Sequence, residues 1–266
     1  MALSQQEKGE NFRALHEGDP FVIPNPWDAG SAKVLAGLGF KALATTSSGF
    51  AFTLGRADGT VTLEEIAAHV TSIADAVELP LSVDLENGYG PAPENAAEAI
   101  TGAALAGAVG GSIEDYDRDQ ERLYAVEEGA ERVSAAAEAA RALEFPFTLT
   151  ARAENHLRGR PEIEETIARL QAYEQAGADV LFAPGLRSAA EIRAICDAVS
   201  KPVNVLAHKG LTMAEITEAG GQRVSVGGAL TWVAVGALAA AAERIRDDGD
   251  FSVLTAPPQL RDWLSS

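Results

Sequence analysis

The sequence has very little cysteine, few aromatic residues and few basic ones. Cys196 is its one cysteine, which excludes an internal disulfide and a cysteine-rich metal site. Aromatic residues make up 6% of the chain, so a core must be built mainly from Ala, Val, Leu and Ile. There are 21 Lys and Arg residues against 39 Asp and Glu residues, for a formal charge of −18. Such a chain repels phosphate backbones and anionic lipids, so we expect no binding to nucleic acid or to a membrane surface.

Long hydrophobic runs are also absent. The longest apolar stretch, near 229–242, is rich in Ala and Gly and is shorter than the roughly 20 residues of a membrane span. The first residues are polar and lack the apolar core of a signal peptide. We therefore expect a cytoplasmic protein that does not span a membrane.

Short apolar runs alternate along the chain with longer runs rich in Ala and Glu, a pattern typical of strands and helices in a parallel sheet. The expected strands lie near 21–25, 42–46, 81–85, 110–114, 147–152, 179–183, 202–206 and 223–226. The expected helices lie near 28–38, 62–77, 93–106, 126–143, 162–176, 188–199, 212–219 and 229–246. Eight of each in 266 residues predict an α/β fold, a (β/α)8 barrel of the TIM type, for which about 250 residues are usual. An open, doubly wound sheet is the alternative.

The predicted elements form one domain. No internal stretch resembles a linker, so we expect a single barrel over 1–250 and a C-terminal connector and tail over 251–266. Several helix starts have good capping residues. Thr62 and Glu65 have the spacing of a capping box, and Ser188 and Thr212 precede similar runs.

Polar residues follow several of the expected strands. In α/β barrels the chemistry lies at the carboxyl ends of the strands, so polar groups there are the first candidates for a site. The candidates for contact with a substrate are Trp27, Thr46, Ser47, Gly49, Asp84, Arg152 and Asn204. A packed core would not choose most of these residue types, which favours a functional interpretation.

Three carboxylates, those of Asp84, Glu86 and Glu114, follow adjacent strands. Close together they repel each other unless they are protonated or bridged by a cation. Oxygen ligands without His or Cys favour Mg²⁺, or alternatively Mn²⁺, with waters kept in the coordination shell. Because side chains alternate along a strand, Asp84 and Glu86 are expected on one side, one bound to the metal directly and the other through water. The alternative is that the three residues are helix N-caps or solvated loop acids.

Arg152 follows an apolar run and is expected to project into the mouth of the barrel. Its guanidinium suits bidentate capture of a substrate carboxylate, and its alternative role is an ion pair with Glu114 or Glu154. The Thr/Ser/Gly run at 45–49 offers backbone N–H groups and hydroxyls to a negatively charged oxygen. Cys196 lies in a helical run and is expected to be only a small buried hydrophobic residue.

With these residues assembled, the chain resembles the isocitrate lyase/phosphoenolpyruvate mutase superfamily over roughly 8–250. The matching segments are LGRAD at 54–58, VDLENGYG at 83–90, SIED at 112–115, TARAEN at 150–155 and AGADVLF at 176–182. The second of these is similar to the family's Asp-x-Asp-x-Gly-Tyr-Gly metal signature, with Glu86 in place of the second Asp.

The resemblance implies a barrel with a Mg²⁺ site and a 2-oxo acid that chelates the metal. It also implies a homodimer or homotetramer in which the last helix is exchanged between neighbours. The implied site residues are Asp84, Glu86 and Glu114 around the metal, Arg152 on the substrate carboxylate, Thr46 and Ser47 as backbone donors, and Asp58 as an acid on a mobile loop.

One departure from the family affects the expected reaction. Isocitrate and methylisocitrate lyases carry a Lys-x-Cys-Gly-His stretch after the fourth strand, whose Cys protonates the departing carbanion, whereas DYDRDQERLYAVEEG at 115–129 contains neither Cys nor His. The chain is therefore closest in character to the oxaloacetate-decarboxylase-like and uncharacterised members. We expect a Mg²⁺-dependent carbon–carbon lyase that acts on small 2-oxo or 2-hydroxy di- or tricarboxylates through an enolate, with Asp58, Glu114 and Arg152 as catalytic candidates. The alternatives are a phosphonopyruvate C–P hydrolase or mutase and a non-catalytic binder of 2-oxo dicarboxylates.

Overall fold

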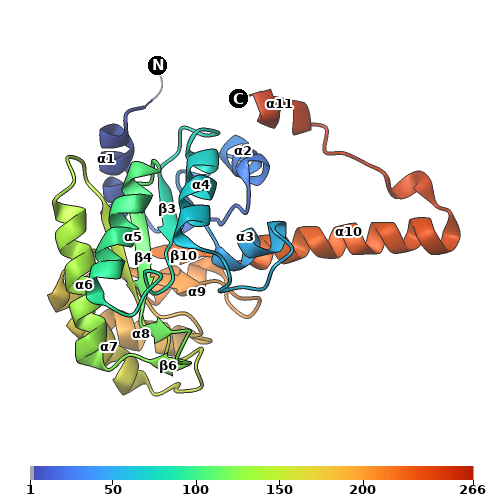
Figure 1. Cartoon of the computed structure of the whole chain (residues 1–266). Helices are drawn as coiled ribbons and strands as arrows, with labels where there is room; N and C mark the ends of the chain where they lie inside the picture. Colours follow the sequence, from blue (N-terminus) through green and yellow to red (C-terminus); the bar gives the residue numbers. More distant parts are fainter. Residues whose placement is uncertain (1–2, 266) are drawn as a thin grey trace.

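The computed structural model describes residues 3–265, and its centre is a barrel of eight parallel strands (Figure 1). In spatial order the strands are β1 (Phe21–Ile23), β10 (Arg223–Ser225), β9 (Val203–Leu206), β8 (Val180–Phe182), β7 (Thr148–Arg152), β4 (Gly110–Glu114), β3 (Leu81–Asp84) and β2 (Leu43–Ala44). The Ala44 N–H donates a 3.1 Å hydrogen bond to the Pro24 carbonyl, which joins the β2 and β1 segments. The predicted (β/α)8 barrel is thus confirmed, and the open sheet is excluded.

A helix follows each strand, and all but the last of these helices pack on the outside of the barrel (Figure 1). These helices are α2 (Ala29–Gly37), α4 (Leu63–Ala74), α5 (Pro93–Leu105), α6 (Val126–Arg141), α7 (Ile163–Ala176), α8 (Ala189–Ala198), α9 (Met213–Glu218) and α10 (Ala229–Asp248). The elements that the sequence pattern did not predict are α1 (Gln5–Leu15), α3 (Ser47–Thr53), the hairpin of β5 (Tyr116–Asp117) and β6 (Arg122–Leu123), the 3-10 turn η1 (Phe251–Val253) and α11 (Leu260–Ser265). All of these are short or lie at the ends of the chain.

The predicted helix starts are confirmed. At the start of α4 the Glu65 N–H donates to the Thr62 hydroxyl oxygen at 3.3 Å, and the Thr62 N–H donates to the Glu65 carboxylate at 2.9 Å. Ser188 and Thr212 form the same reciprocal pair of bonds at α8 and α9. A cap of this kind stabilises a helix by about 1 kcal/mol, because it satisfies N–H groups that have no partner within the helix.

The hydrophobic core lies between the strands and the surrounding helices. Gly111 of β4 faces this layer, since a Cβ there would lie 3.0 Å from Leu85 and 3.5 Å from Ile100 of α5. Small residues let α5 approach the strands closely, and its Ala96 and Ala99 are fully buried. Burial of each larger side chain in this layer stabilises the fold by roughly 1.5–3 kcal/mol.

The interior of the barrel is polar and is organised around Arg223. This buried guanidinium donates to Asn204 Oδ1 at 2.8 Å and to Thr150 Oγ1 at 2.9 Å, and its Nη1 lies 3.2 Å from His16 Nε2. His16 Nδ1 lies 2.8 Å from the Phe12 carbonyl, which can only accept, so Nδ1 carries the proton and Nε2 accepts from Arg223. Burial and the Arg223 charge lower the pKa of His16 to about 3, so the imidazole is neutral.

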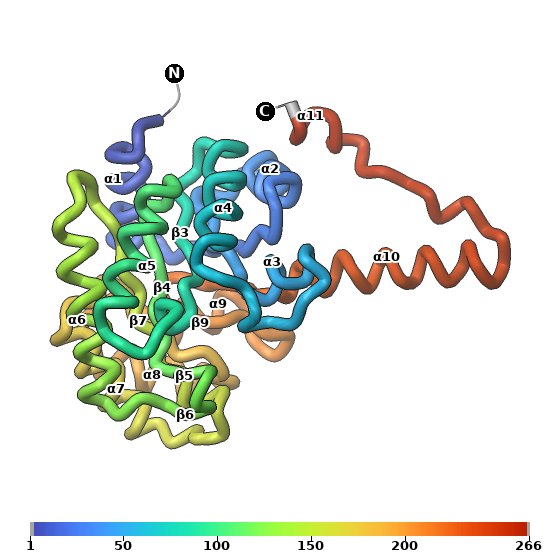
Figure 2. Tube along the Cα trace, viewed as in Figure 1, coloured from blue at the N-terminus to red at the C-terminus, as the bar shows by residue number. Residues whose placement is uncertain are grey.

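The C-terminal segment leaves the barrel (Figure 2). Helix α10 projects outward, and the chain then turns back so that α11 packs against α2. Within α10, all of which the structure describes, Thr231 is the one buried residue. The exchange of this helix between subunits stays a prediction. Among residues 3–265, no helix has both the length and the hydropathy needed to cross a membrane.

Candidate active site

A cavity of about 200 Å³ opens at the carboxyl ends of the strands. The predicted site residues that line it are Thr46, Ser47, Asp58, Asp84, Arg152 and Asn204. Those that the structure places outside its lining are Trp27, Gly49, Glu86 and Glu114. Convergence of parallel strand ends explains why residues far apart in the sequence meet here.

Asp84 ends β3 and is joined to the neighbouring strand end. Its N–H donates to Thr45 Oγ1 at 3.0 Å, and its Oδ2 accepts from the Ser47 N–H at 3.2 Å. Thr46 and Ser47 begin α3, so their polar groups face the same cavity as the Asp84 carboxylate. The site therefore places a carboxylate beside backbone and hydroxyl donors.

Gly49 and Trp27 lie behind this wall. A Cβ on Gly49 would lie 2.7 Å from Thr46 Cγ2, 2.8 Å from Thr231 Oγ1 and 3.1 Å from Trp27 Cβ. The absence of a side chain at Gly49 thus allows α3 to pack against α10 and the β1 loop. These contacts position the second strand end, and direct contact of either residue with a substrate stays a prediction.

Asn204 lines the cavity, but both ends of its amide are engaged. Its Oδ1 accepts from Arg223 Nε at 2.8 Å, and its Nδ2 donates to Ser225 Oγ at 3.0 Å. Asn204 therefore fixes the buried Arg223 at the floor of the cavity. Its predicted contact with substrate is not tested by this arrangement.

Glu86 follows β3 in a turn rather than in a strand. The strand ends at Asp84, and Glu86 has a left-handed backbone with φ of 48°. The alternation of side chains along a strand therefore does not set the direction of the Glu86 side chain. The prediction that Asp84 and Glu86 lie on one side for this reason does not hold, because the strand ends before Glu86. The side chain is buried, and its Oε2 lies 3.0 Å from Arg118 Nε.

Arg152 supplies positive charge to the site and is held by Glu154. Arg152 Nε donates to Glu154 Oε1 at 2.6 Å, while its Nη1 lies 3.3 Å from Glu114 Oε2 and 3.8 Å from Asp84 Oδ1. The ion-pair role considered for Arg152 is thus confirmed, and because the residue also lines the cavity, its capture of a substrate carboxylate stays a prediction. Its guanidinium also lies over the Phe182 ring, 5.5 Å from the ring centre, which limits its motion.

A second arginine, Arg118, reaches the site from the β5–β6 hairpin. Its Nε lies 3.0 Å from Glu86 and 3.7 Å from Glu114, and its Nη2 lies 3.5 Å from Asp58. Arg118 lines the cavity. It was absent from the predicted site residues, because the hairpin that carries it has no sequence pattern that would indicate its position.

A buried network below the cavity holds these groups in place. Asp115 Oδ2 accepts from the Tyr173 hydroxyl at 2.5 Å and from Arg169 at 2.9 Å, and its Oδ1 accepts from the Glu154 N–H at 2.7 Å. Asp115 therefore links α7 to the strand ends that carry Glu114 and Arg152. A fully satisfied buried network of this kind fixes side-chain direction.

The acidic side of the site carries excess negative charge in a buried setting. Burial raises the pKa of Glu86 to about 7 against the opposing charge of Arg118. Burial also raises the pKa of Glu114, while Arg152 opposes this shift and Glu154 adds to it. One oxygen of Glu86 and both oxygens of Glu114 accept no hydrogen bond. Such oxygens suit a further cation or ordered water.

The residues fit a divalent ion held largely through water. In the part of the chain that the structure describes, no three His, Cys, Asp or Glu side chains are arranged to hold a metal directly. Of the three predicted ligands, Asp84 lines the cavity, while Glu86 and Glu114 lie behind it. Mg²⁺ commonly keeps several waters and takes one or two carboxylates, so this donor set is suited to it.

Fold and site together define the class: a (β/α)8 barrel enzyme whose strand ends present carboxylates and a buried arginine to a small cavity. The sequence profile of the phosphoenolpyruvate phosphomutase family matches residues 12–246. The chain belongs to this family, and its predicted membership of the isocitrate lyase/phosphoenolpyruvate mutase superfamily is confirmed. Similar proteins include a lyase, a decarboxylase and hydrolases that act on small organic acids.

Two curated relatives catalyse different reactions. An oxaloacetate decarboxylase of Bradyrhizobium diazoefficiens is 30% identical over 273 residues, covering 99% of this chain and 91% of its own length. The 2-methylisocitrate lyase of Escherichia coli is 30% identical over 228 residues, covering 82% and 73% respectively. Because the chain is equally identical to both enzymes, sequence identity does not distinguish between their two reactions.

Solved structures are similar over almost the whole chain. A protein of Burkholderia cenocepacia J2315 assigned as a lyase or mutase is 49% identical, with a TM-score of 0.94 over 98% of this chain and 97% of its own. A phosphonopyruvate hydrolase solved with oxalate and Mg²⁺ is 25% identical, with a TM-score of 0.86 over 97% and 94%. The barrel and its strand ends are therefore shared with enzymes of this superfamily.

Proposed function

We propose that the protein is a divalent-metal-dependent lyase that cleaves a carbon–carbon bond of a small 2-oxo dicarboxylate, with decarboxylation of oxaloacetate as the leading case. The observation that carries this proposal is the lining of the cavity, which combines Asp84 with Arg152 and, among the described residues, includes neither Cys nor His. Carbon dioxide departs without taking up a proton, so decarboxylation needs no acid at the leaving group. A retro-aldol lyase needs a base for the substrate hydroxyl and an acid for the departing carbanion.

Arg152 would bind a substrate carboxylate. Its Nε is held by Glu154 at 2.6 Å and its plane lies over Phe182, so little side-chain freedom is lost when an anion binds. A cavity of about 200 Å³ suits a ligand of a few carbon atoms better than a large one. A second carboxylate of the substrate would lie away from Asp84, because like charges repel.

Asp84 would hold the metal directly, and Glu86 and Glu114 would hold its waters. When bound, the ion would polarise the oxo group of the substrate and favour the enolate. Thr46 and Ser47 lie beside Asp84 and would donate hydrogen bonds to the oxygen on which negative charge develops. The Mg²⁺ and oxalate in the phosphonopyruvate hydrolase structure support this arrangement by analogy.

Cleavage of a 2-hydroxy acid is the second candidate. It would require a base, for which Asp58 is placed at the cavity on the loop that follows α3. Tyr89 is not suited to that role, because burial and the nearby carboxylates raise its pKa far above neutrality. The link between Asp58 and Arg118, at 3.5 Å, is the feature that would hold such a base in place.

The reaction can be tested with a substrate panel. We expect pyruvate from oxaloacetate in the presence of Mg²⁺ or Mn²⁺, and loss of that activity with a chelator. The measurement is coupled detection of pyruvate for oxaloacetate and 2-methylisocitrate, and of phosphate for phosphonopyruvate. Phosphate release would favour C–P chemistry instead. Thermal stabilisation by 2-oxo acids without any product would favour a non-catalytic binder.

Arg118 is expected to compete with the metal. It places a positive charge next to Glu86 and Glu114, the carboxylates that would hold the waters of the ion. Replacing it by methionine should tighten Mn²⁺ binding about fivefold to tenfold, since like charges a few ångströms apart repel by roughly 1–4 kcal/mol. The measurement is titration of free Mn²⁺ by electron paramagnetic resonance.

The matched control is Arg122→Met in the same hairpin. Arg122 pairs with Glu128 at 2.7 Å and is outside the cavity lining, so its removal should leave Mn²⁺ affinity unchanged. Weaker Mn²⁺ binding in Arg118→Met than in Arg122→Met would show that Arg118 organises the carboxylates rather than competing with the ion.

We also propose that α10 packs against a second copy of the chain. Large apolar side chains are exposed on α10 and after it, at Trp232, Val233, Leu238, Phe251 and Leu254. An apolar surface that extends away from a folded body is typical of an interface. The family resemblance favours a dimer or tetramer with the last helix exchanged.

Leu238→Glu should dissociate this assembly, because it places a charge in the proposed interface. The side chain is 68% exposed in the isolated chain, so the barrel itself should remain folded. Light scattering after size exclusion measures the mass. Leu105→Glu, at an 86% exposed leucine on α5, is the control and should keep the mass of the unmodified protein. A monomeric unmodified protein would contradict the proposal.

A further inference from the structure

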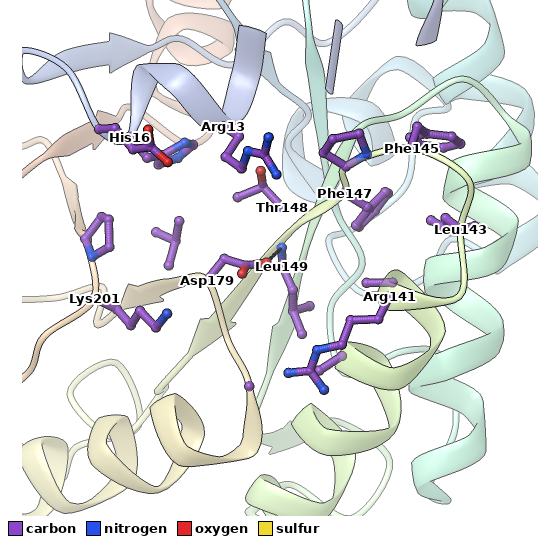
Figure 3. Close-up of a pocket in the computed structure, with 17 residues that line it drawn as sticks. Arg13, His16, Arg141, Leu143, Phe145, Phe147, Thr148, Leu149, Asp179 and Lys201 are labelled. Carbon is purple, nitrogen blue, oxygen red and sulfur yellow. Dashed lines mark hydrogen bonds between the residues drawn. The ribbon is translucent and has the colours of Figure 1, made fainter. Parts of the chain in front are cut away.

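A second hollow, of about 440 Å³, lies at the opposite end of the barrel (Figure 3). It is bounded by α1, the end of α6, the starts of β7 and β8 and the segment before β9. Its lining differs in charge from the chain as a whole. Three cations, Arg13, Arg141 and Lys201, line it together with two acidic residues, Glu17 and Asp179.

The three cations converge from separate elements. Figure 3 shows the side chains of Arg13, Arg141 and Lys201 around Asp179 in the middle of the hollow. Among residues 3–265, none of these cations lies within 4.0 Å of a carboxylate oxygen. Burial raises the pKa of the Asp179 carboxyl, while the Leu149 N–H and the charges of all three cations oppose this rise.

The hollow therefore has positive charge that Asp179 does not neutralise. Asp179 Oδ2 is already engaged, since it accepts from the Leu149 N–H at 2.9 Å. His16, which also lines the hollow, is neutral because its pKa is lowered to about 3. Three positive charges against those of Glu17 and Asp179 leave an excess of one, in a chain whose formal charge is −18.

One side of the hollow is apolar. Phe145 and Phe147 lie on the side away from Lys201 in Figure 3, and Leu143 and Pro146 extend the same wall. Charged groups facing an apolar wall across a concave site match a ligand with one anionic end and one apolar end.

The helix ends explain part of this arrangement. Arg13 and Arg141 lie in the last turns of α1 and α6, where a positive charge interacts favourably with the helix dipole. That role does not require the two side chains to meet each other or Lys201, which belongs to no helix. Convergence of all three on one hollow is what points to a ligand.

We propose that this hollow binds a small organic anion, with a carboxylate or phosphate group among Arg13, Arg141 and Lys201 and an apolar body against Phe145 and Phe147. The site is separate from the candidate active site and does not depend on the proposed reaction. The net negative charge of the chain disfavours a polyanion such as nucleic acid.

Binding can be tested with three probes of similar size: phenylacetate, phenyl phosphate and the neutral benzyl alcohol. We expect calorimetry to detect binding of at least one anion and none of the alcohol. Tighter binding of phenylacetate would indicate a carboxylate ligand, and tighter binding of phenyl phosphate would indicate a phosphate ligand. Equal binding of the neutral alcohol, or binding of neither anion, would overturn the proposal.

Charge-removing variants locate the site. Arg13→Gln and Lys201→Gln should each weaken the anion about fivefold, and the double variant about twentyfold, as expected for loss of exposed charge pairs. Both residues are exposed, so folding should be retained. The control is Lys41→Gln, an exposed lysine before β2 that lies outside the hollow and should bind as the unmodified protein does. Unchanged affinity in the double variant would place the anion elsewhere and overturn the proposal.

Discussion

Replacing Asp84 by asparagine should lower metal-dependent turnover by about a hundredfold or more, because it removes the one predicted metal ligand that lines the cavity. The amide oxygen can still accept the Ser47 N–H, which the carboxylate accepts at 3.2 Å, so the local backbone should be kept. The same substitution should abolish the rise in melting temperature produced by Mg²⁺ together with oxalate, since a ligand stabilises only a fold that binds it. Turnover and thermal shift are the two measurements.

A control substitution tests whether the effect comes from the loss of any negative charge or from the position of Asp84 in the cavity. Asp197→Asn removes one negative charge from the exposed face of α8, remote from the cavity, and should change neither quantity. Without ligand, the Asp84 variant should be at least as stable as the unmodified protein, because repulsion with the buried Glu86 and Glu114 is relieved. Normal metal-dependent turnover in Asp84→Asn would contradict its assignment as the metal ligand.

Arg152→Lys should reduce kcat/KM by about a hundredfold, mainly by raising KM. Lysine keeps a positive charge near Glu114 and Glu154 but cannot form the two parallel bonds that a guanidinium gives a carboxylate. A loss of this size corresponds to about 2.7 kcal/mol. Removing the charge altogether would leave buried carboxylates unpaired and risk unfolding, so lysine is the informative replacement.

Arg158→Lys is the control for this prediction. Arg158 pairs with the same buried Glu154, at 2.9 Å, but is outside the lining of the cavity. If Arg152 binds the substrate, the Arg158 variant should keep kcat/KM within about threefold, the range of a weakened ion pair. Equal losses in the two variants would show that Arg152 serves only to neutralise Glu154.

The barrel could be predicted because its strands and helices each have a distinct sequence pattern. The fully buried strands are short apolar runs, and the helices that cover them are Ala-rich with clear N-caps such as Thr62 and Ser188. Eight strands that alternate with helices are then the number that closes a parallel barrel. The two-residue strands β5 and β6 and the short α3 could not be predicted, since their formation depends on tertiary contacts rather than on periodicity.

Part of the candidate site could also be predicted, from the order of the strands. Asp84, Arg152 and Asn204 line the cavity because parallel strands bring their carboxyl ends together. Arg118 could not be placed from the sequence, because the hairpin that carries it has no pattern of its own. Its three carboxylate neighbours belong to other segments.

Loop geometry accounts for the remaining differences. The left-handed φ of 48° at Glu86 cannot be read from its neighbours, so the direction of its side chain was not predictable from strand alternation. Gly49 and Trp27 follow strand ends as substrate contacts would, yet they pack behind Thr46. A position after a strand identifies the edge of the barrel, but the turn that follows decides which side chains reach the cavity.

If Asp84, with Glu86 and Glu114 behind it, holds a divalent ion that chelates a 2-oxo acid facing Arg152, binding of such an acid must depend on the metal. Calorimetric titration of oxalate into the protein, with Mg²⁺ and again with a chelator, tests it most directly. We expect oxalate binding with Mg²⁺ that weakens at least about a hundredfold when the metal is removed, since the ion supplies most of the contacts to the ligand. Equal oxalate affinity in both titrations would contradict it.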